Sequence, residues 1–158
     1  LLVGEERGSV LVRLFLKNHR PFTLRAMAGQ ETALLFRRPF RWFFSHLDVL
    51  DGSGAAIGSV TREFALLRRV YTVRDAAGRL CFTLFGPVLR PWTFQIMQDD
   101  REVGLIQKKW SGMLKEAFSD ADNFGVTFPP DADPATKSLL LGAVFLIDFV
   151  HFENRPGN

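Results

Sequence analysis

The stretch DADNFGVTFPPDAD, which begins at Asp120, holds four aspartates, and carboxylate oxygens are among the ligands that calcium prefers in proteins. An EF-hand loop has oxygen ligands at its positions 1, 3, 5 and 12 and a glycine at position 6. With Asp120 at position 1, Asp122 falls at position 3 and Gly125 at position 6. Asp131 takes position 12, but Phe124 stands at position 5 and breaks the pattern. The spacing therefore predicts a calcium loop with an incomplete ligand set.

Two features of the same stretch favour weak calcium binding or none. An aspartate at position 12 reaches less far than the usual glutamate, and Pro129 and Pro130 stiffen the chain. We therefore expect a Kd of about 10⁻⁴ to 10⁻³ M. Asp133 followed by Pro134 has instead the form of a helix N-cap with proline at the first helical position. Both interpretations, a calcium loop and the acidic lead-in to a helix, stay open.

Arginines and aromatic rings alternate in FRRPFRWFF, residues 36–44. Guanidinium groups bind phosphate oxygens in a fork geometry, and aromatic rings suit the level of lipid headgroups. The predicted lipid-binding residues here and in two further basic pairs are Arg37, Arg38, Arg41, Trp42, Phe43, Arg68, Arg69, Lys108 and Lys109. Single-stranded nucleic acid is a weaker alternative, because the net charge is only +3 and no binding motif is present. A third interpretation makes the arginines ordinary solvated residues of strands.

Residue types that do covalent chemistry are sparse. His19, His46 and His151 are far apart in the sequence and lack metal-ligand spacing. Cys81, the one cysteine, is expected to be a small core residue, and no nucleophile or phosphate-loop motif is present. We therefore predict that the protein is not an enzyme in the covalent sense.

Short strands separated by turn residues are expected to position these side chains. LDVLDGSGAAIGSV and VYTVRDAAGRLCFTLFG each hold two β-rich runs around a turn sequence, which predicts two hairpins, and SVLVRLFL predicts an earlier strand. RPFTLRAM at 20–27 recurs as RPWTFQIM at 90–97, and IGSVTREF at 57–64 recurs as VGLIQKKW at 103–110. Repetition of a hairpin unit around a closed sheet explains this, because closure removes exposed strand edges.

The segment PATKSLLLGAVFLIDFVHFE, residues 134–153, is the most apolar in the chain and predicts a helix buried on all sides. Its apolar core spans about 22 Å, less than the roughly 30 Å of a bilayer interior, and an aspartate in lipid costs several kcal/mol. A helix enclosed by the strands is therefore favoured over a membrane span. A short helix is predicted at 110–119. The expected buried helix residues are Leu140, Phe145, Leu146, Asp148 and Phe149, with Asp148 in a polar contact.

The composition predicts one folded domain with an uneven distribution of charge. The 158 residues are 47% hydrophobic with 16 Phe, which predicts one folded domain over residues 1–158. A single cysteine excludes an internal disulfide and fits the cytoplasm. Because the chain starts with Leu, we expect the natural protein to have a further N-terminal region. Residues 1–95 hold 14 Lys and Arg against 7 Asp and Glu, whereas residues 96–158 hold 6 against 10, which predicts a basic surface for an anionic partner.

The chain from VGLIQKKWSGMLKEAF to LIDFVHFE, residues 103–153, resembles the C-terminal signature of the phospholipid scramblase family nearly position for position. RPFTLRAMAGQETALLFRRPFR at 20–41 resembles the first hairpin of the family. Scramblases are similar in turn to Tubby-like and LURP-one-related proteins. The resemblance implies a mainly β fold, a closed antiparallel barrel of 12 strands that encloses a hydrophobic C-terminal helix.

The resemblance also implies a peripheral protein at the cytoplasmic face of a membrane, which moves phospholipids between leaflets when calcium rises. Its expected partners are anionic phospholipids, besides protein partners, and its expected cofactor is Ca²⁺. The calcium segment proposed for the family falls here on Asp120, Asp122, Asn123, Phe124, Gly125, Phe128, Asp131 and Asp133. The alternative is a membrane-tethering module that binds phosphoinositides or proteins and scrambles nothing.

One departure from the family pattern concerns membrane anchoring. Family members commonly carry an acylated, cysteine-rich stretch after the RPFR-like motif, but this chain has WFFSHLDV there, without a cysteine. Palmitoyl anchoring at this place is therefore not expected. Trp42, Phe43 and Phe44 either replace it as interfacial anchors or belong to the core.

Overall fold

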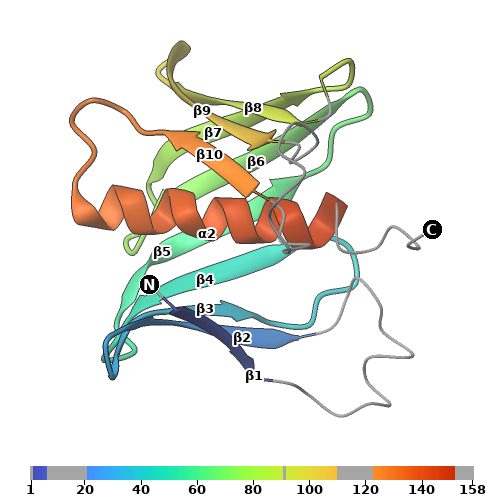
Figure 1. The fold of residues 1–158 in the computed structure, drawn as a ribbon. Coiled ribbons are helices and arrows are strands. Elements are labelled where there is room, and N and C mark those ends of the chain that lie inside the picture. The colour runs from blue at the N-terminus through green and yellow to red at the C-terminus, as the bar shows by residue number, and fades with distance from the viewer. Residues whose placement is uncertain (1, 7–20, 91, 110–122, 152–158) are drawn as a thin grey trace, which may run out of the picture.

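The computed structural model describes residues 2–6, 21–90, 92–109 and 123–151. Within them, ten antiparallel strands form one sheet in sequence order, and each strand pairs with the next along the chain (Figure 1). The strands are β1 (Leu2–Glu6), β2 (Phe22–Ala28), β3 (Glu31–Arg38), β4 (His46–Asp51), β5 (Ala56–Glu63), β6 (Arg68–Asp75), β7 (Leu80–Pro87), β8 (Thr93–Gln98), β9 (Arg101–Lys109) and β10 (Asn123–Thr127). A single described helix, α2 (Pro134–His151), follows β10.

The sheet curves around α2, which lies along its concave side (Figure 1). β1 and β10 are the two edges of the sheet, and no pairing joins them among the described residues. The prediction of a mainly antiparallel β fold with a C-terminal helix is thus confirmed. The structure described is an open sheet of ten strands, so it does not establish the closed barrel of 12.

Both hairpins predicted from turn sequences are present. In the β4–β5 connection, the Asp51 carboxylate accepts hydrogen bonds from the backbone N–H groups of Ser53 and Ala55, each at 2.9 Å. In the β6–β7 connection, Asp75 accepts in the same way from Ala77 and Arg79, again at 2.9 Å. These aspartates fold the turn locally, because their side chains satisfy backbone donors that no strand partner can reach.

The repeated sequence units fall on strands of the same meander. Residues 20–27 and 90–97 include most of β2 and β8, and residues 57–64 and 103–110 include most of β5 and β9. The strand predicted at 9–16 and the short helix predicted at 110–119 lie outside the described residues.

The core lies between the concave face of the sheet and α2. Alternate residues of each strand point inward, as in β7, where Phe82, Leu84 and Gly86 are buried and their neighbours are not. Gly142 allows close packing of the helix, because a Cβ at this position would stand 2.7 Å from a methyl group of Val49.

The predicted helix residues Leu140, Leu146 and Phe149 are buried, whereas Phe145 and Asp148 are half-buried. By length and composition, α2 is apolar enough to cross a membrane, although 44% of it is buried inside the protein. In the structure, α2 therefore packs on the sheet with one side. Its other apolar side is only half-buried, so the helix is not buried on all sides as the sequence predicted.

A meander of antiparallel strands has its connections at two opposite ends, which differ here in character. At one end, called the loop end below, lie the β3–β4, β5–β6 and β7–β8 connections and the C-terminal end of α2 (Figure 1, right). At the other, called the turn end, lie the tight β2–β3, β4–β5, β6–β7 and β8–β9 turns and the β10–α2 connection (Figure 1, left).

Candidate lipid-binding surface

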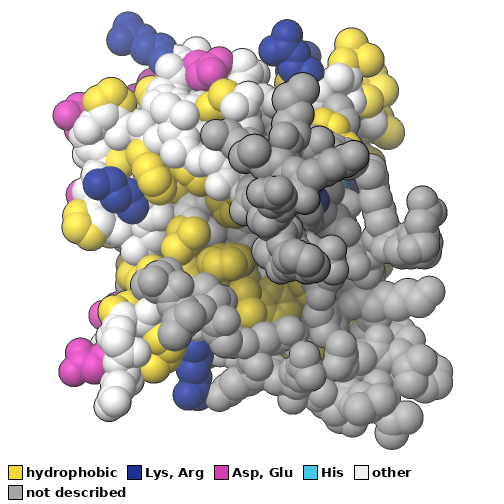
Figure 2. Space-filling model, in the orientation of Figure 1, with side chains coloured by type: hydrophobic (Ala, Val, Ile, Leu, Met, Phe, Trp, Pro, Cys, Tyr) yellow, Lys and Arg dark blue, Asp and Glu magenta, His cyan; other side chains and the backbone are white. Residues whose placement is uncertain are grey.

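Large apolar side chains are exposed at the loop end. In the β3–β4 connection, Trp42 is 71% and Phe43 is 88% exposed, and the Trp42 ring packs edge-on against Phe40 with centroids 5.1 Å apart. In the β5–β6 connection, Leu66 is 88% exposed, and in the β7–β8 connection Leu89 is 95% exposed. Figure 2 shows apolar side chains gathered at the corner where the last two connections lie. Such a cluster on a folded domain marks an interaction surface.

Charge is divided between the two ends. In the loop-end ranges 37–45, 61–70, 86–90 and 106–109, nine Lys and Arg stand against one acidic residue, Glu63. The end of β1 adds Glu5 and Glu6 at this end of the sheet, and the last turn of α2 adds Asp148. In the turn-end ranges 29–33, 51–56, 75–79, 98–102 and 128–134, eight Asp and Glu stand against two arginines. The apolar end is thus also the basic end, a combination that suits an anionic lipid surface.

The first predicted basic residues separate onto opposite faces of β3. Arg37 is exposed on the outer face, where its Nε lies 3.4 Å from the Asp48 carboxylate. Asp48 also accepts from His46 at 2.9 Å, which joins Arg37 to a polar cluster on the outer face of β4 and β5. Arg38 is only 3% exposed. Its guanidinium stands 4.2 Å from the ring centroid of Phe149, so Arg38 holds the end of α2 and cannot reach a membrane.

The second basic pair also divides. Arg69 lies over the Phe94 ring at 4.9 Å and donates a hydrogen bond to the Pro87 carbonyl at 3.2 Å, so it organises the β7–β8 connection. Burial lowers the pKa of Arg69, with the positive charge of Arg62 in the same direction. Arg68 is exposed on the outer face. Of this pair, Arg68 is the residue that a ligand can reach.

Of the remaining predicted residues, Arg41 is exposed, in the β3–β4 connection beside Trp42. Lys108 is half-buried, with its Nζ 5.8 Å from the ring centroids of Trp92 and Phe124. Lys109 ends β9, and its side chain lies outside the described residues. The structure thus brings Arg41, Arg68 and the aromatic pair of the β3–β4 connection to one end of the sheet.

The predicted calcium stretch does not form one compact ligand loop where it is described. Asn123, Phe124 and Gly125 belong to β10, which pairs with β9 in regular register. Phe128, Asp131 and Asp133 follow at the turn end, the far end of this strand from residue 123. Asp120 and Asp122 lie outside the described residues. An EF-hand loop folds back on its ion, whereas five residues in a strand extend over about 16 Å, so the described geometry does not fit that pattern.

Asp133 has a structural role that the sequence indicated. Its Oδ1 accepts a hydrogen bond of 2.7 Å from the backbone N–H of Thr136, which is the N-cap geometry. The hydrogen bond with the Thr136 side chain, followed by this backbone contact, lowers the pKa of Asp133. Among the described residues, no three His, Cys, Asp or Glu side chains lie close enough to hold a metal ion.

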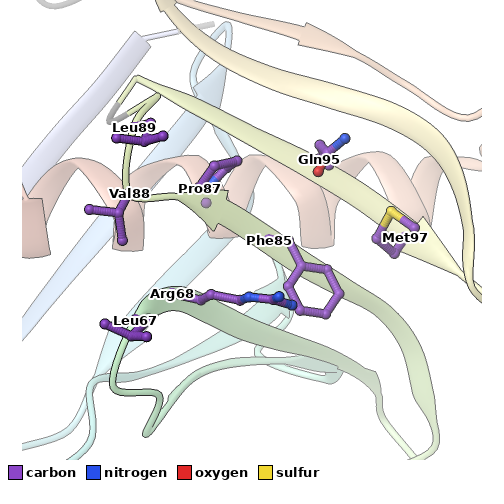
Figure 3. Close-up of a pocket in the computed structure, with 9 residues that line it drawn as sticks. Leu67, Arg68, Phe85, Pro87, Val88, Leu89, Gln95 and Met97 are labelled. Atoms are coloured by element: carbon purple, nitrogen blue, oxygen red, sulfur yellow. The ribbon is translucent and has the colours of Figure 1, made fainter.

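The outer face carries a pocket of about 590 Å³ that the sequence reading missed. It lies at the loop end over β6, β7 and β8, on the side of the sheet away from α2 (Figure 3). Its lining residues are Leu67, Arg68, Phe85, Gly86, Pro87, Val88, Leu89, Gln95 and Met97. A signal was present in the sequence: FALL at 64–67 and VL at 88–89 put apolar residues between strands, where turn residues are the rule.

Among the described residues, Cys81, His46 and His151 lie apart from the pocket lining. Cys81 is half-buried, and burial raises the pKa of its thiol, which disfavours the reactive thiolate. His151 lies at the loop end of α2, where its Nε2 is 2.7 Å from the Tyr71 hydroxyl. His46 lies between Thr61 and Asp48 on the open outer face.

Fold and surface together define a class, a curved antiparallel sheet that cradles one apolar helix and carries a basic, apolar end. The family model described as Scramblase matches residues 1–154, and the chain belongs to this family. It is 36% identical to mouse phospholipid scramblase 1 over 155 residues, 88% of this chain and 47% of the relative. It is 35% identical to human phospholipid scramblase 2 over 150 residues, 85% of this chain and 50% of the relative.

A more distant relative is human phospholipid scramblase family member 5, which is 29% identical over 158 residues, 90% of this chain and 58% of the relative. The chain therefore spans about half the length of the curated relatives it matches. No solved structure matches.

Proposed function

We propose that this domain binds the surface of anionic phospholipid membranes through its loop end and contributes to the movement of phospholipids between leaflets. The observation that carries the proposal is the coincidence of exposed aromatic side chains with an excess of arginine at one end of the sheet. The names of the relatives, phospholipid scramblases, support the same substrate class. A cytoplasmic, peripheral location belongs to this proposal.

The proposed contact has two components. Trp42 and Phe43 enter the boundary between headgroups and acyl chains, while Arg41 and Arg68 bind phosphate oxygens. Arg38 has no part in this contact, because it is buried under α2. Movement of lipid needs no covalent step, since it requires only a lower barrier for a headgroup to cross hydrocarbon. In the whole protein, we further propose that two additional strands close the sheet into the barrel of 12.

The contact is tested by binding of the full chain to vesicles of phosphatidylserine and phosphatidylcholine, measured by flotation. We expect Phe43→Ser to weaken binding by at least tenfold, because a buried phenyl ring contributes about 2 kcal/mol. Leu80→Ser is the matched control, since Leu80 is also exposed but lies at the turn end. Equal effects of the two substitutions, or equal binding to pure phosphatidylcholine, would contradict the proposed contact.

Transbilayer movement is tested on the same vesicles with a labelled phospholipid and an external quencher. Proteoliposomes are expected to expose the label of the inner leaflet when calcium is added. Binding without exposure would favour the alternative function, a membrane-tethering module, and would leave the lipid contact intact.

Calcium responsiveness stays a prediction. The described part of the aspartate stretch does not form an EF-hand loop, so calcium binding depends on Asp120 and Asp122, and Asp131 is separated from them by β10. In a calorimetric titration into the millimolar range, Asp120→Asn with Asp122→Asn is expected to abolish the heat of binding, whereas Asp131→Asn is expected to preserve it. No heat from the unmodified chain would remove calcium from the proposal.

A further inference from the structure

The pocket on the outer face of β6, β7 and β8 differs from a flat membrane-contact surface, because it can enclose part of one molecule. Its volume of about 590 Å³ lies within the roughly 300–1,000 Å³ usual for small-ligand sites. Outward-facing residues of neighbouring strands form its floor: Phe85 of β7 is paired with Gln95 of β8, and Met97 lies one outward position further along. A rigid sheet therefore fixes the shape of this site.

The lining is mostly apolar, with one cation, Arg68, and one amide, Gln95, which donates a hydrogen bond of 2.6 Å to Glu102. Phe85, Pro87 and Met97 contribute apolar surface, and the lining includes no acidic side chain. Figure 3 shows the Arg68 side chain extending over the outer face toward Phe85, while Leu67, Val88 and Leu89 lie at the loop-end side of the pocket. An apolar floor beneath a single guanidinium suits a molecule with a hydrocarbon chain and an anionic group.

The rim of the pocket connects it to the proposed membrane surface. Leu67 is 81%, Val88 is 60% and Leu89 is 95% exposed, so three aliphatic side chains project into solvent beside the opening. Leu89 precedes Arg90, whose backbone carbonyl accepts a hydrogen bond of 3.4 Å from Arg69. A rim of this kind suits the headgroup layer of a bilayer, and the proposed membrane contact of the loop end would bring the opening of the pocket to the phospholipids.

We propose that this pocket binds a single membrane phospholipid, with one acyl chain against Phe85 and Met97 and its phosphate beside Arg68. This inference rests on the proposed membrane contact and adds a specific lipid site to it. Bulk contact through the β3–β4 connection needs no such site, so the two can fail separately.

The test uses a phospholipid that dissolves as a monomer, dihexanoyl phosphatidylserine below its micelle concentration, so that no membrane surface is present. The full chain carries ¹³C-methyl methionine, which labels three residues, and Met27 on β2 serves as an internal reference. Met97→Leu, a volume-conserving change, assigns the Met97 signal. We expect a saturable shift of the Met97 signal and no shift of the Met27 signal.

Variants separate the parts of the lipid that are recognised. Arg68→Gln is expected to raise the Kd about tenfold by removing a charge-assisted hydrogen bond to phosphate, whereas Arg101→Gln, the same change at the turn end, leaves the Kd unchanged. Glycerophosphoserine, which has the phosphate but no acyl chains, is expected not to shift Met97. A shift with glycerophosphoserine equal to that with the lipid would overturn the acyl-chain site in favour of a phosphate site.

Two further results would overturn the proposal. One is the absence of a saturable Met97 shift in a chain that still binds anionic vesicles, which would leave the proposed function standing. The other is a Met97 shift produced by an apolar peptide and not by the lipid, which would assign the pocket to a protein partner. If the chain binds neither vesicles nor monomeric lipid, both proposals fail together.

Discussion

Arg38 shows how a single side chain can belong to the core although its sequence context suggests a surface. Its guanidinium packs on the Phe149 ring and donates a hydrogen bond of 3.1 Å to the Ser45 hydroxyl. Burying a cation costs free energy unless aromatic and polar groups replace its water, and both are present here. Arg38 thus joins β3, the β3–β4 connection and the end of α2.

His151 makes the stability of the folded protein depend on pH. Its Nε2 lies 2.7 Å from the hydroxyl of the buried Tyr71. Burial, followed by the charges of Arg69 and Arg62, lowers the pKa of His151 from 6.5 to about 4. As the pH falls below 6.5, His151 binds a proton in the unfolded chain but stays neutral in the folded chain. The contribution of His151 to stability is therefore complete above this pH and is lost toward pH 4.

We expect this histidine to lower the free energy of unfolding by about 1 kcal/mol between pH 7 and pH 5, roughly half the full linkage value, because the ring is only half-buried. Urea denaturation of the unmodified chain and of His151→Gln at both pH values measures the effect. The glutamine can retain a hydrogen bond to Tyr71 but does not titrate. The same pH dependence in both chains would contradict the assignment.

The alternation of side chains along a strand explains why the sequence predicted only some of the site residues correctly. Arg37 and Arg38 are adjacent in β3 and therefore point to opposite faces of the sheet, so one of them had to face inward. Nothing in FRRPFR tells which one, because that depends on how β3 is aligned with β2 and β4. Prediction of the turns succeeded, since Asp51 and Asp75 determine their own backbone hydrogen bonds within a few residues.

At the scale of elements, the start of α2 depends on Asp133. The Asp133 carboxylate accepts from the backbone N–H of Thr136, which satisfies one of the first free N–H groups of the helix, and the Asp133 carbonyl accepts the first intrahelical bond from Lys137. We expect Asp133→Ala to lower the free energy of unfolding by about 1 kcal/mol in urea denaturation. Asp131→Ala, at an exposed position two residues earlier, is expected to change it by less than about 0.5 kcal/mol. Equal losses would show that the cap contributes nothing specific.

The β10 strand shows a limit of motif spacing. Three of its residues, Asn123, Phe124 and Gly125, fall in the calcium segment that the family resemblance implied, yet alternating Phe124 and Val126 pack partly against the core as in any strand. A motif counts positions along the chain, whereas a ligand set needs positions in space. Pairing of β10 with β9 therefore sets the geometry of this segment. That pairing depends on the order and alignment of all strands in the sheet, so a short motif does not reveal it.

At the scale of the whole molecule, the difference between the two ends predicts where charge matters. Arg90 lies in the β7–β8 connection and Arg101 at the start of β9, on opposite ends of the sheet. Arg90→Glu is expected to weaken binding to anionic vesicles by about 30-fold, since it exchanges a charge contributing about 1 kcal/mol in attraction for one in repulsion. Arg101→Glu is expected to leave binding nearly unchanged.

Flotation at two salt concentrations measures this difference. The gap between Arg90→Glu and the unmodified chain should narrow at high ionic strength, because salt screens exposed charges. An equal loss in both variants would mean that net charge, and not its position, controls binding.

The difference in charge between the two ends of the sheet affects how the domain approaches an anionic membrane. Because cations gather where β3, β5 and β7 end and acidic residues gather at the opposite turns, the charges of the described residues form an electric dipole along the strands. A dipole in the field of an anionic surface experiences a torque before any atom touches. The domain would therefore rotate during diffusion until its loop end faces the membrane, so that a larger share of encounters would lead to binding.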